Sequence, residues 1–218
     1  MDLNRKTEGG SEFEPAPEGV HNAVCVSIVD LGTQKERAYQ STEIVEKRLV
    51  EIRWELDETR DDGKPFMIMK RYKQSLHEKS ALRAHLEAWQ GKPFSDEQLD
   101  NFDLNRLLGR GCQIQIGRTE GGNAKIMSVM ALSKGAKAPK PSIVPFLLDL
   151  DAFDKEAFDA LSDRMKETIA KSPEYQALQA KKTANGAKPA AKPAVAAKPA
   201  KPSAQVEHAE DLDDEIAV

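Results

Sequence analysis

Lys, Arg and Tyr residues stand close together in two stretches of the sequence, around positions 35–39 and 70–73. Lys and Arg side chains pair with phosphates, and a Tyr ring stacks on a base, which contributes about 1 to 3 kcal/mol per base. This combination predicts a surface for single strands of nucleic acid, with Tyr72 as the main stacking residue. We expect the surface to lie on the outer faces of the second and third strands and the loop after the first, and to include Lys35, Arg37, Tyr39, Lys47, Arg53, Lys70, Arg71, Tyr72 and Lys73.

The charge and aromatic content refine this expectation. With aromatic residues at only 6%, affinity should depend mainly on phosphate contacts and fall as salt rises. The formal charge of −4 is unevenly distributed, so it does not argue against such a surface. Residues 181–205 contain six Lys and no acid, residues 207–218 contain six acids and no Lys or Arg, and residues 21–133 contain seventeen of each sign.

Signatures of catalysis are missing from the sequence. It contains no phosphate-binding glycine loop, no Gly-x-Ser-x-Gly and no paired metal ligands. The cluster Asp57, Glu58, Asp61 and Asp62 has the residue types of a nuclease metal site, but beside Gly63 a solvated turn is the simpler interpretation. We therefore expect a binding protein without enzyme activity, metal or cofactor.

The composition predicts one main domain with tails. A hydrophobic content of 39% supports one core, whereas Pro, Ala and Lys dominate after residue 180. No apolar run approaches the roughly 20 residues of a membrane span, and the N-terminus resembles no signal peptide, so we expect a cytoplasmic protein. We expect a disordered arm over 1–18, a globular domain over 19–175, a flexible Ala/Lys/Pro linker over 176–206 and an acidic tip over 207–218.

Five segments alternate in polarity as strands do, and a helical pattern separates the third from the fourth. In the helical stretch, Leu82, Leu86 and Trp89 share one face. Ser75 with Glu78 predicts the start of this helix as a capping box, and Gly91 predicts its end. Asp62-Gly63 predicts a hairpin between the second and third strands. The strands are expected at 21–32, 45–56, 65–73, 111–120 and 124–132.

The second strand has the clearest alternation, which predicts a core face and a wet face. The core face carries Val50, Ile52, Trp54 and Leu56, and the wet face carries Leu49, Glu51, Arg53 and Glu55. Trp54 and Trp89 share phase with core residues and are expected to be structural, and Cys25 and Cys112 are expected to be buried, reduced thiols. In the third strand, the pattern leaves open which face points outward.

Two further elements are expected after the fifth strand. Residues 144–150 are a candidate sixth strand, and residues 154–172 carry an amphipathic stripe of Phe158, Leu161, Met165 and Ile169. We expect this helix to cap the domain, with a subunit contact as the alternative. The order strand-strand-strand-helix-strand-strand is that of the barrel that binds oligonucleotides and oligosaccharides. The sequence thus predicts a mainly β fold with α-helices: a closed or nearly closed five-stranded OB-fold-like barrel, a helix between strands three and four, an extra C-terminal helix and a disordered tail.

The end of the chain predicts a partner-binding peptide on a tether. Residues 181–205 have almost no large apolar side chain, so they cannot bury enough surface to become ordered. The tip combines dense negative charge with a terminal apolar pair, which suits steering to a basic groove and anchoring there; a solubilising end is the alternative. The expected contact residues are Asp211, Leu212, Asp213, Asp214, Glu215, Ile216, Ala217 and Val218.

This organisation resembles single-stranded DNA-binding proteins of the bacterial and phage kind. The segments DLGTQ (30–34), WEL (54–56), SLHEKSALR (75–83) and LEAWQGKPF (86–94) resemble phage-encoded members of that group. The resemblance implies largely sequence-independent binding of single-stranded DNA in replication or recombination, within the host cytoplasm, and protein partners recruited by the tip. In the bacterial family the tip normally ends in Pro-Phe, whereas this chain has Ala217 and Val218 there. A Val side chain buries less apolar area than a Phe ring, so the resemblance does not imply docking to the usual partners.

A second class of function stays open. The barrel of an interaction or recombination accessory module would bind a protein partner instead of nucleic acid, while the tail recruits another. In either case the sequence is compatible with a homo-oligomer. Binding of a labelled oligonucleotide separates the two classes.

Overall fold

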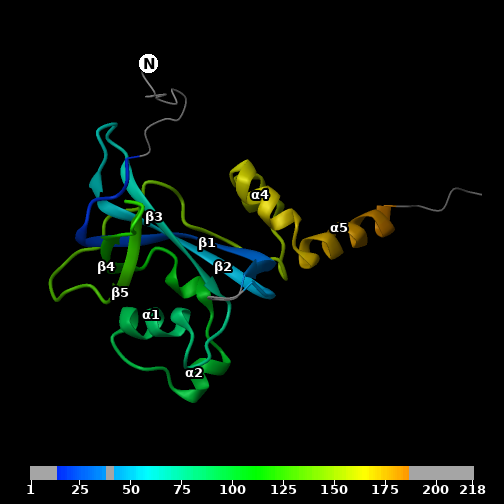
Figure 1. Cartoon of the computed structure of the whole chain (residues 1–218), viewed down its shortest axis with the longest axis horizontal. Coiled ribbons are helices and arrows are strands. Elements are labelled where there is room, and N and C mark those ends of the chain that lie inside the picture. The colour runs from blue at the N-terminus through cyan, green and yellow to red at the C-terminus, as the bar shows by residue number, and fades with distance from the viewer. Residues whose placement is uncertain (1–13, 38–41, 187–218) are drawn as a thin grey trace, which may run out of the picture.

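A predominantly antiparallel sheet forms the body of the protein (Figure 1). The computed structural model describes residues 14–37 and 42–186. In this part of the chain the strands are joined in the order β3-β2-β1-β4-β5, and β6 pairs in parallel with β1. Their bounds are β1 Gly19–Arg37, β2 Ile44–Thr59, β3 Pro65–Lys73, β4 Gly111–Arg118, β5 Ala124–Met130 and β6 Phe146–Leu148.

The five predicted strands and the candidate sixth are confirmed, but the sheet is not closed into a barrel. β3 pairs with β2 and β5 pairs with β4, and no ladder between β3 and β5 is present in the described residues. A side chain bridges these two strands, since Lys70 Nζ donates to the Ile126 carbonyl at 3.2 Å. Closure depends on strand tilt and stagger, which an alternating pattern of residues does not specify.

Helices follow β3 and β6, and they lie on different sides of the sheet (Figure 1). The first group packs beneath the sheet and the second group continues beyond β6. The single helix predicted over 154–172 is two helices, because Ser162 has an extended backbone and starts a new N-terminus. The bounds are α1 Ala81–Gln90, α2 Asp96–Asp100, η1 Leu104–Leu107, α3 Lys155–Asp159, α4 Asp163–Ala170 and α5 Pro173–Gly186.

The predicted start of α1 was wrong by about a turn and a half, whereas its end is confirmed. Ser80, with an extended backbone, accepts a hydrogen bond from the Leu82 N–H and caps the helix. Ser75 instead begins a non-helical turn, in which its carbonyl accepts from the Ser80 hydroxyl at 2.6 Å. Gly91 ends α1 at φ 75°, a left-handed conformation that glycine adopts without steric cost.

The larger core lies between the inner face of the sheet and α1. Trp54 from β2 and Trp89 from α1 meet there with ring centroids 6.1 Å apart, which confirms that both are structural. Cys25 and Cys112 are buried, unpaired thiols, as predicted. Burial raises the pKa of Cys25 to about 12, so this thiol stays protonated and unreactive at neutral pH.

A second core covers the opposite face of β1 and β2. Val29, Leu31 and Leu49 pack there against residues of β6, α3 and α4. Met165 and Ile169 of the amphipathic stripe belong to this core. The expected capping role is therefore confirmed. The prediction of a wet face on β2 was wrong: Glu51 and Glu55, both in that face, are 0% and 1% exposed.

The contact between β1 and α5 explains why residue 32 is a glycine. Gly32 has φ 67°, and a Cβ built there would lie 2.5 Å from Ser172 Cβ. The neighbouring Thr33 donates from its N–H and its hydroxyl to Glu174 at 2.8 and 2.6 Å. The absence of a side chain lets α5 dock on the strand.

The chain ends differ from the predicted arm and linker. Ala16 is buried in the larger core, whereas Glu14, Pro15 and Glu18 are exposed, and residues 1–13 lie outside the described part. α5 extends to Gly186 and so takes up the start of the predicted linker. The rest of the linker and the acidic tip lie outside the described residues. None of the helices in the described ranges is long and apolar enough to cross a bilayer.

Candidate nucleic-acid interface

The outer face of β3 is an exposed row of apolar and basic side chains. Strand pairing with β2 turns Phe66, Ile68 and Tyr72 into the core, which settles the question that the sequence left open. The alternate residues therefore point outward, and Met69 is 56% exposed. The outward row consists of Met67, Met69, Arg71 and Lys73.

A buried carboxylate orients two guanidinium groups beside this row. Glu51 Oε1 accepts from Arg53 Nε at 2.8 Å, and Glu51 Oε2 accepts from Arg71 Nε at 2.9 Å. The Arg side chains are partly exposed, whereas that of Glu51 is not. Within the described residues no acceptor is bonded to the terminal nitrogens of Arg71, which leaves that edge open to an anion.

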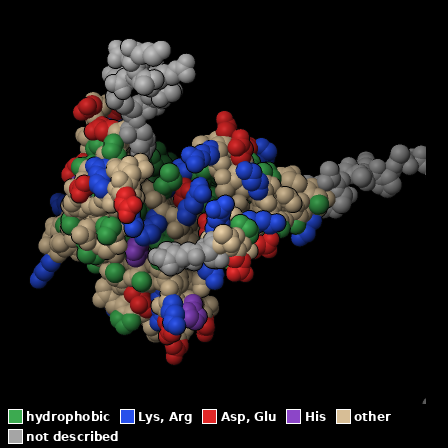
Figure 2. All heavy atoms as spheres, viewed as in Figure 1, with side chains coloured by type: hydrophobic (Ala, Val, Ile, Leu, Met, Phe, Trp, Pro, Cys, Tyr) green, Lys and Arg blue, Asp and Glu red, His purple; other side chains and the backbone are tan. Residues whose placement is uncertain are grey.

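The second helical layer supplies the opposite wall. Arg53 Nη2 contacts Met165 Sδ of α4, and a hollow of about 340 Å³ opens between β3 and this helix. Lys and Arg side chains gather between the strands and α4 on the face drawn in Figure 2. The hollow is lined by Glu51, Arg53, Met69, Arg71, Ser162, Arg164 and Met165.

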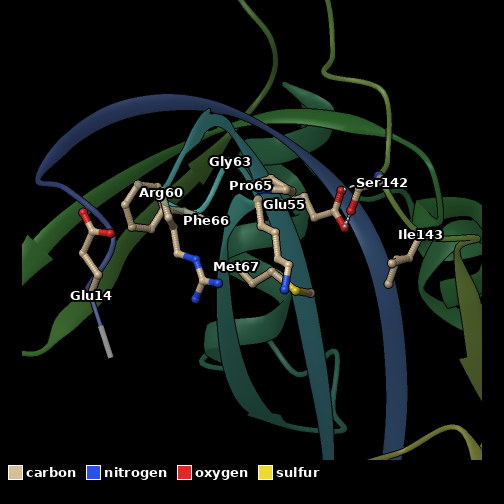
Figure 3. Close-up of a pocket in the computed structure, with 10 residues that line it drawn as sticks. Glu14, Glu55, Arg60, Gly63, Pro65, Phe66, Met67, Ser142 and Ile143 are labelled. Atoms are coloured by element: carbon tan, nitrogen blue, oxygen red, sulfur yellow. Dashed lines mark hydrogen bonds between the residues drawn. The ribbon is translucent and has the colours of Figure 1, made fainter. Parts of the chain in front are cut away.

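An apolar hollow of about 580 Å³ adjoins the same strand near the β2–β3 turn. Phe66 and Met67 lie on one side of it and Ile143 on the other (Figure 3). The far wall is held by Glu55, which accepts from the Ser142 N–H and hydroxyl, both at 2.6 Å. Because Met67 and Met69 are alternate residues on one face of β3, the two hollows follow the same side of the strand.

The expected stacking residue lies inside the protein. Tyr72 is only 3% exposed, and its hydroxyl lies 2.9 Å from His85 Nδ1 of α1. Burial raises the pKa of Tyr72, and burial followed by the nearby Lys70 lowers that of His85 to about 4. The assignment of Tyr72 to base stacking is therefore wrong for this structure. Its basic neighbours suggested a surface position, but the strand alternates and places them on the other face.

Lys70 also faces inward. Its ammonium group donates to the Ile126 carbonyl and lies 5.6 Å from the centroid of the Tyr72 ring. Burial, and then the charge of Lys125, lowers the pKa of Lys70. Lys70 therefore joins β3 to β5, a role that the sequence did not indicate.

The other predicted residues divide between two places. Arg53, Arg71 and Lys73 come together at the outer face of β3. Lys35, Arg37 and Lys47 lie where the last residues of β1 pair with the first residues of β2. Residues 33–37, expected in the loop after the first strand, belong to β1. Lys35 is 3.9 Å from Glu46, and Lys47 is 3.8 Å from Glu36, so two of these charges already have partners. Tyr39 and the predicted tip residues lie outside the described part of the chain.

Sequence reasoning missed the residues that complete the site. Arg164 stands more than 100 positions after Arg53, and no local pattern relates them. Glu51 was assigned to a wet face, although its alternation with Arg53 on β2 could have suggested an ion pair. The sequence placed Met67 and Met69 on one face of β3. It did not show that this face points outward, so the two residues were not assigned to the site.

The acidic turn has partners of its own. Asn22 donates to Asp57 at 2.8 Å, His21 Nδ1 lies 3.0 Å from Glu58, and Arg60 pairs with Asp62. Within residues 14–37 and 42–186, no group of three or more His, Cys, Asp or Glu side chains is arranged to hold a metal ion. Three of the four acids of this cluster thus have protein partners.

No protein-family model matches the chain, and no curated protein is similar to it. The function is therefore inferred from the geometry of the site.

Proposed function

We propose that the protein binds single-stranded DNA along the outer face of β3, largely without regard to sequence. The observation that carries this proposal is the buried Glu51, which holds Arg53 and Arg71 by their Nε atoms. Arg71, fixed in this way, keeps its terminal N–H groups for a second acceptor, whereas Arg53 already contacts Met165 Sδ through Nη2. Phosphate oxygens suit those donors in charge and geometry.

The neighbouring side chains favour a strand whose bases are unpaired. Met67 and Met69 offer exposed, adaptable apolar surface beside the guanidinium groups. In a duplex the base faces are stacked on one another, whereas in a single strand they are free to lie on such a surface. Met contacts do not read base edges, so they add affinity without sequence choice.

We further infer that the sheet belongs to the OB class. The strand order β3-β2-β1-β4-β5, with α1 between β3 and β4, supports this inference. The Lys70 contact from β3 to β5 lies where backbone pairing would close a barrel of that class. A structure of the DNA-bound protein with a continuous β3–β5 ladder would establish it.

The biological setting that fits is phage-type replication or recombination in the cytoplasm. In that setting the acidic tip, residues 207–218, recruits partner proteins while the β3 face holds DNA. Pull-down of replication proteins by the full chain, and its loss on removal of 207–218, tests the partner role separately from DNA binding.

The central experiment is binding of a labelled oligothymidylate and of a duplex of equal length at low salt. The intact protein should prefer the single strand. Lys73→Glu with Arg164→Glu should abolish most of the binding, because both side chains are exposed and line or adjoin the hollow. Lys79→Glu with Lys134→Glu makes the same charge change at exposed positions elsewhere and should bind better than the first pair. Equal affinity for duplex and single strand would contradict the proposal.

A second function is favoured by the hollow of about 580 Å³. Ile143 and Val144 beside it are 41% and 85% exposed. These side chains suit a protein partner with apolar anchors. Val144→Asp should weaken binding of a protein partner and leave oligonucleotide binding unchanged if the hollow serves a protein, and both should stay unchanged if it does not.

A further inference from the structure

A separate hollow of about 290 Å³ lies beside α1, α2 and η1. Its wall contains three cationic and three amide side chains, one aromatic ring and no acidic residue. A pocket of this volume is near the lower end of those that hold small ligands. The lining residues are Gln90, Lys92, Gln98, Asn101, Phe102, Arg106 and Arg110.

The cations around this hollow form no ion pairs with the described residues. In the described ranges, none of Lys92, Arg106 and Arg110 forms an ion pair, whereas Arg48, Arg53, Arg71 and Arg83 all do. Like charges held together without a counter-ion repel one another and attract anions from solution. Two of the three amide groups already donate within the protein, Gln90 to the Lys92 carbonyl and Asn101 to the Glu97 carbonyl, and each NH2 group keeps a second N–H.

The backbone fixes the two arginines relative to each other. The Arg110 N–H donates to the Leu107 carbonyl at 3.0 Å, and its carbonyl accepts from Cys25 at 3.1 Å, which ties it to β1. Arg106 belongs to η1, whose N-cap Asp103 accepts from the Asn105 N–H at 2.8 Å. Phe102 is set by edge contact with Phe94, with centroids 5.0 Å apart. The charges therefore stand on ordered elements.

We propose that this hollow is a second anion site that binds phosphate groups, those of a nucleic-acid strand in particular. Arg106 and Arg110 supply guanidinium groups that can grip phosphate oxygens in pairs, Lys92 adds a point charge, and Phe102 gives an attached sugar or base an apolar contact. The site shares no lining residue with the hollow beside β3, so it does not depend on DNA binding there.

The test is a double variant, Arg106→Ala with Arg110→Ala, in the full chain. Both residues are exposed, so the thermal midpoint without ligand should stay close to that of the intact protein. Oligothymidylate affinity at low salt should fall by about tenfold, and the slope of log affinity against log salt should become shallower by about 1.4, because each lost phosphate contact contributes about 0.7. The matched control is Lys79→Ala with Lys134→Ala, two exposed cations outside the hollow, which should change neither quantity as much.

Two further arms identify the source of the phosphate. In a Lys73→Ala, Arg164→Ala background the arginine pair should still lower residual oligonucleotide binding, which separates this site from the β3 face. Pyrophosphate alone should raise the thermal midpoint of the intact protein and not of the arginine variant. A pyrophosphate effect without any oligonucleotide effect would support the anion site but assign it to a free phosphate compound. No effect of the arginine pair on either ligand would overturn the proposal.

Discussion

Loss of two charges at the β3 face should change the salt dependence of DNA binding by a calculable amount. Arg53 and Arg71 share the single carboxylate of Glu51, so this trio carries a net charge of about +1. Lys73 and Arg164 raise the net charge of the face to about +3. For single strands, the slope of log affinity against log salt is about −0.7 per phosphate neutralised, which gives about −2 for this face.

This slope implies that raising salt from about 50 to about 200 mM weakens the intact face about 20-fold. Lys73→Ala with Arg164→Ala leaves a net charge of about +1, a slope of about −0.7 and a loss of about threefold over the same range. If the arginine hollow also binds the strand, both slopes become steeper by the same amount and their difference of about 1.4 persists.

Fluorescence anisotropy with a labelled oligothymidylate of about 16 nucleotides, titrated at several salt concentrations, measures both slopes. Lys79→Ala with Lys134→Ala is the matched control, since these exposed cations line neither hollow. Parallel lines for the intact protein and the Lys73, Arg164 variant would refute the assignment of phosphates to this face. So would an equal change of slope in the control.

Four further outcomes are expected. Gly32→Ala should destabilise the protein by more than 2 kcal/mol in urea unfolding, because its left-handed backbone costs about 1 to 2 kcal/mol and its Cβ would meet Ser172; Gly63→Ala, at φ 76° with open space, should cost only the backbone part. Glu51→Gln should lower the free energy of unfolding by about 3 kcal/mol and should weaken oligonucleotide binding. This loss is at the low end for a broken buried ion pair because the two arginines are partly exposed. Tyr72→Phe should lower stability by about 1 kcal/mol through loss of the His85 contact and leave oligonucleotide affinity unchanged. His85, whose pKa in the folded protein is about 4, should reduce stability as pH falls from about 6.5 towards 4, since the unfolded chain binds the proton more readily, and His85→Gln should flatten that part of the pH profile.

Each outcome has a result that would count against it. Equal losses for the two glycine variants would mean that α5 does not dock closely on β1. Unchanged DNA binding in Glu51→Gln, with the fold intact, would remove the role given to the oriented guanidinium groups. A large loss of affinity in Tyr72→Phe would restore the tyrosine to the binding surface. An unchanged acid profile in His85→Gln would place the titrating group elsewhere.

The sequence determined the elements whose signals are local. Alternation over 50–56 placed Val50, Ile52 and Trp54 in the core, and Gly91 marked the end of α1, as the structure confirms. These features follow from which residue types repeat at period two and from the one residue that adopts positive φ freely. The start of α1 was less secure, because Ser75 and Ser80 are both capable caps and their local sequences did not decide between them.

Only the tertiary structure decided what covers the second face of β2 and hence where the site lies. Alternation distinguishes two faces of a strand, but it cannot tell whether water or another layer lies against the polar one. β6 and α4 come from about 90 to 115 positions further along the chain and pack over this side of the sheet, and α4 brings Arg164 and Met165 to the hollow that Glu51 and Arg53 line. The inward turn of Tyr72 has a similar cause, since pairing of β3 with β2 fixes its direction whatever charges flank it. A buried carboxylate that orients cations is a product of contacts between distant segments, so no local pattern in the sequence could specify it.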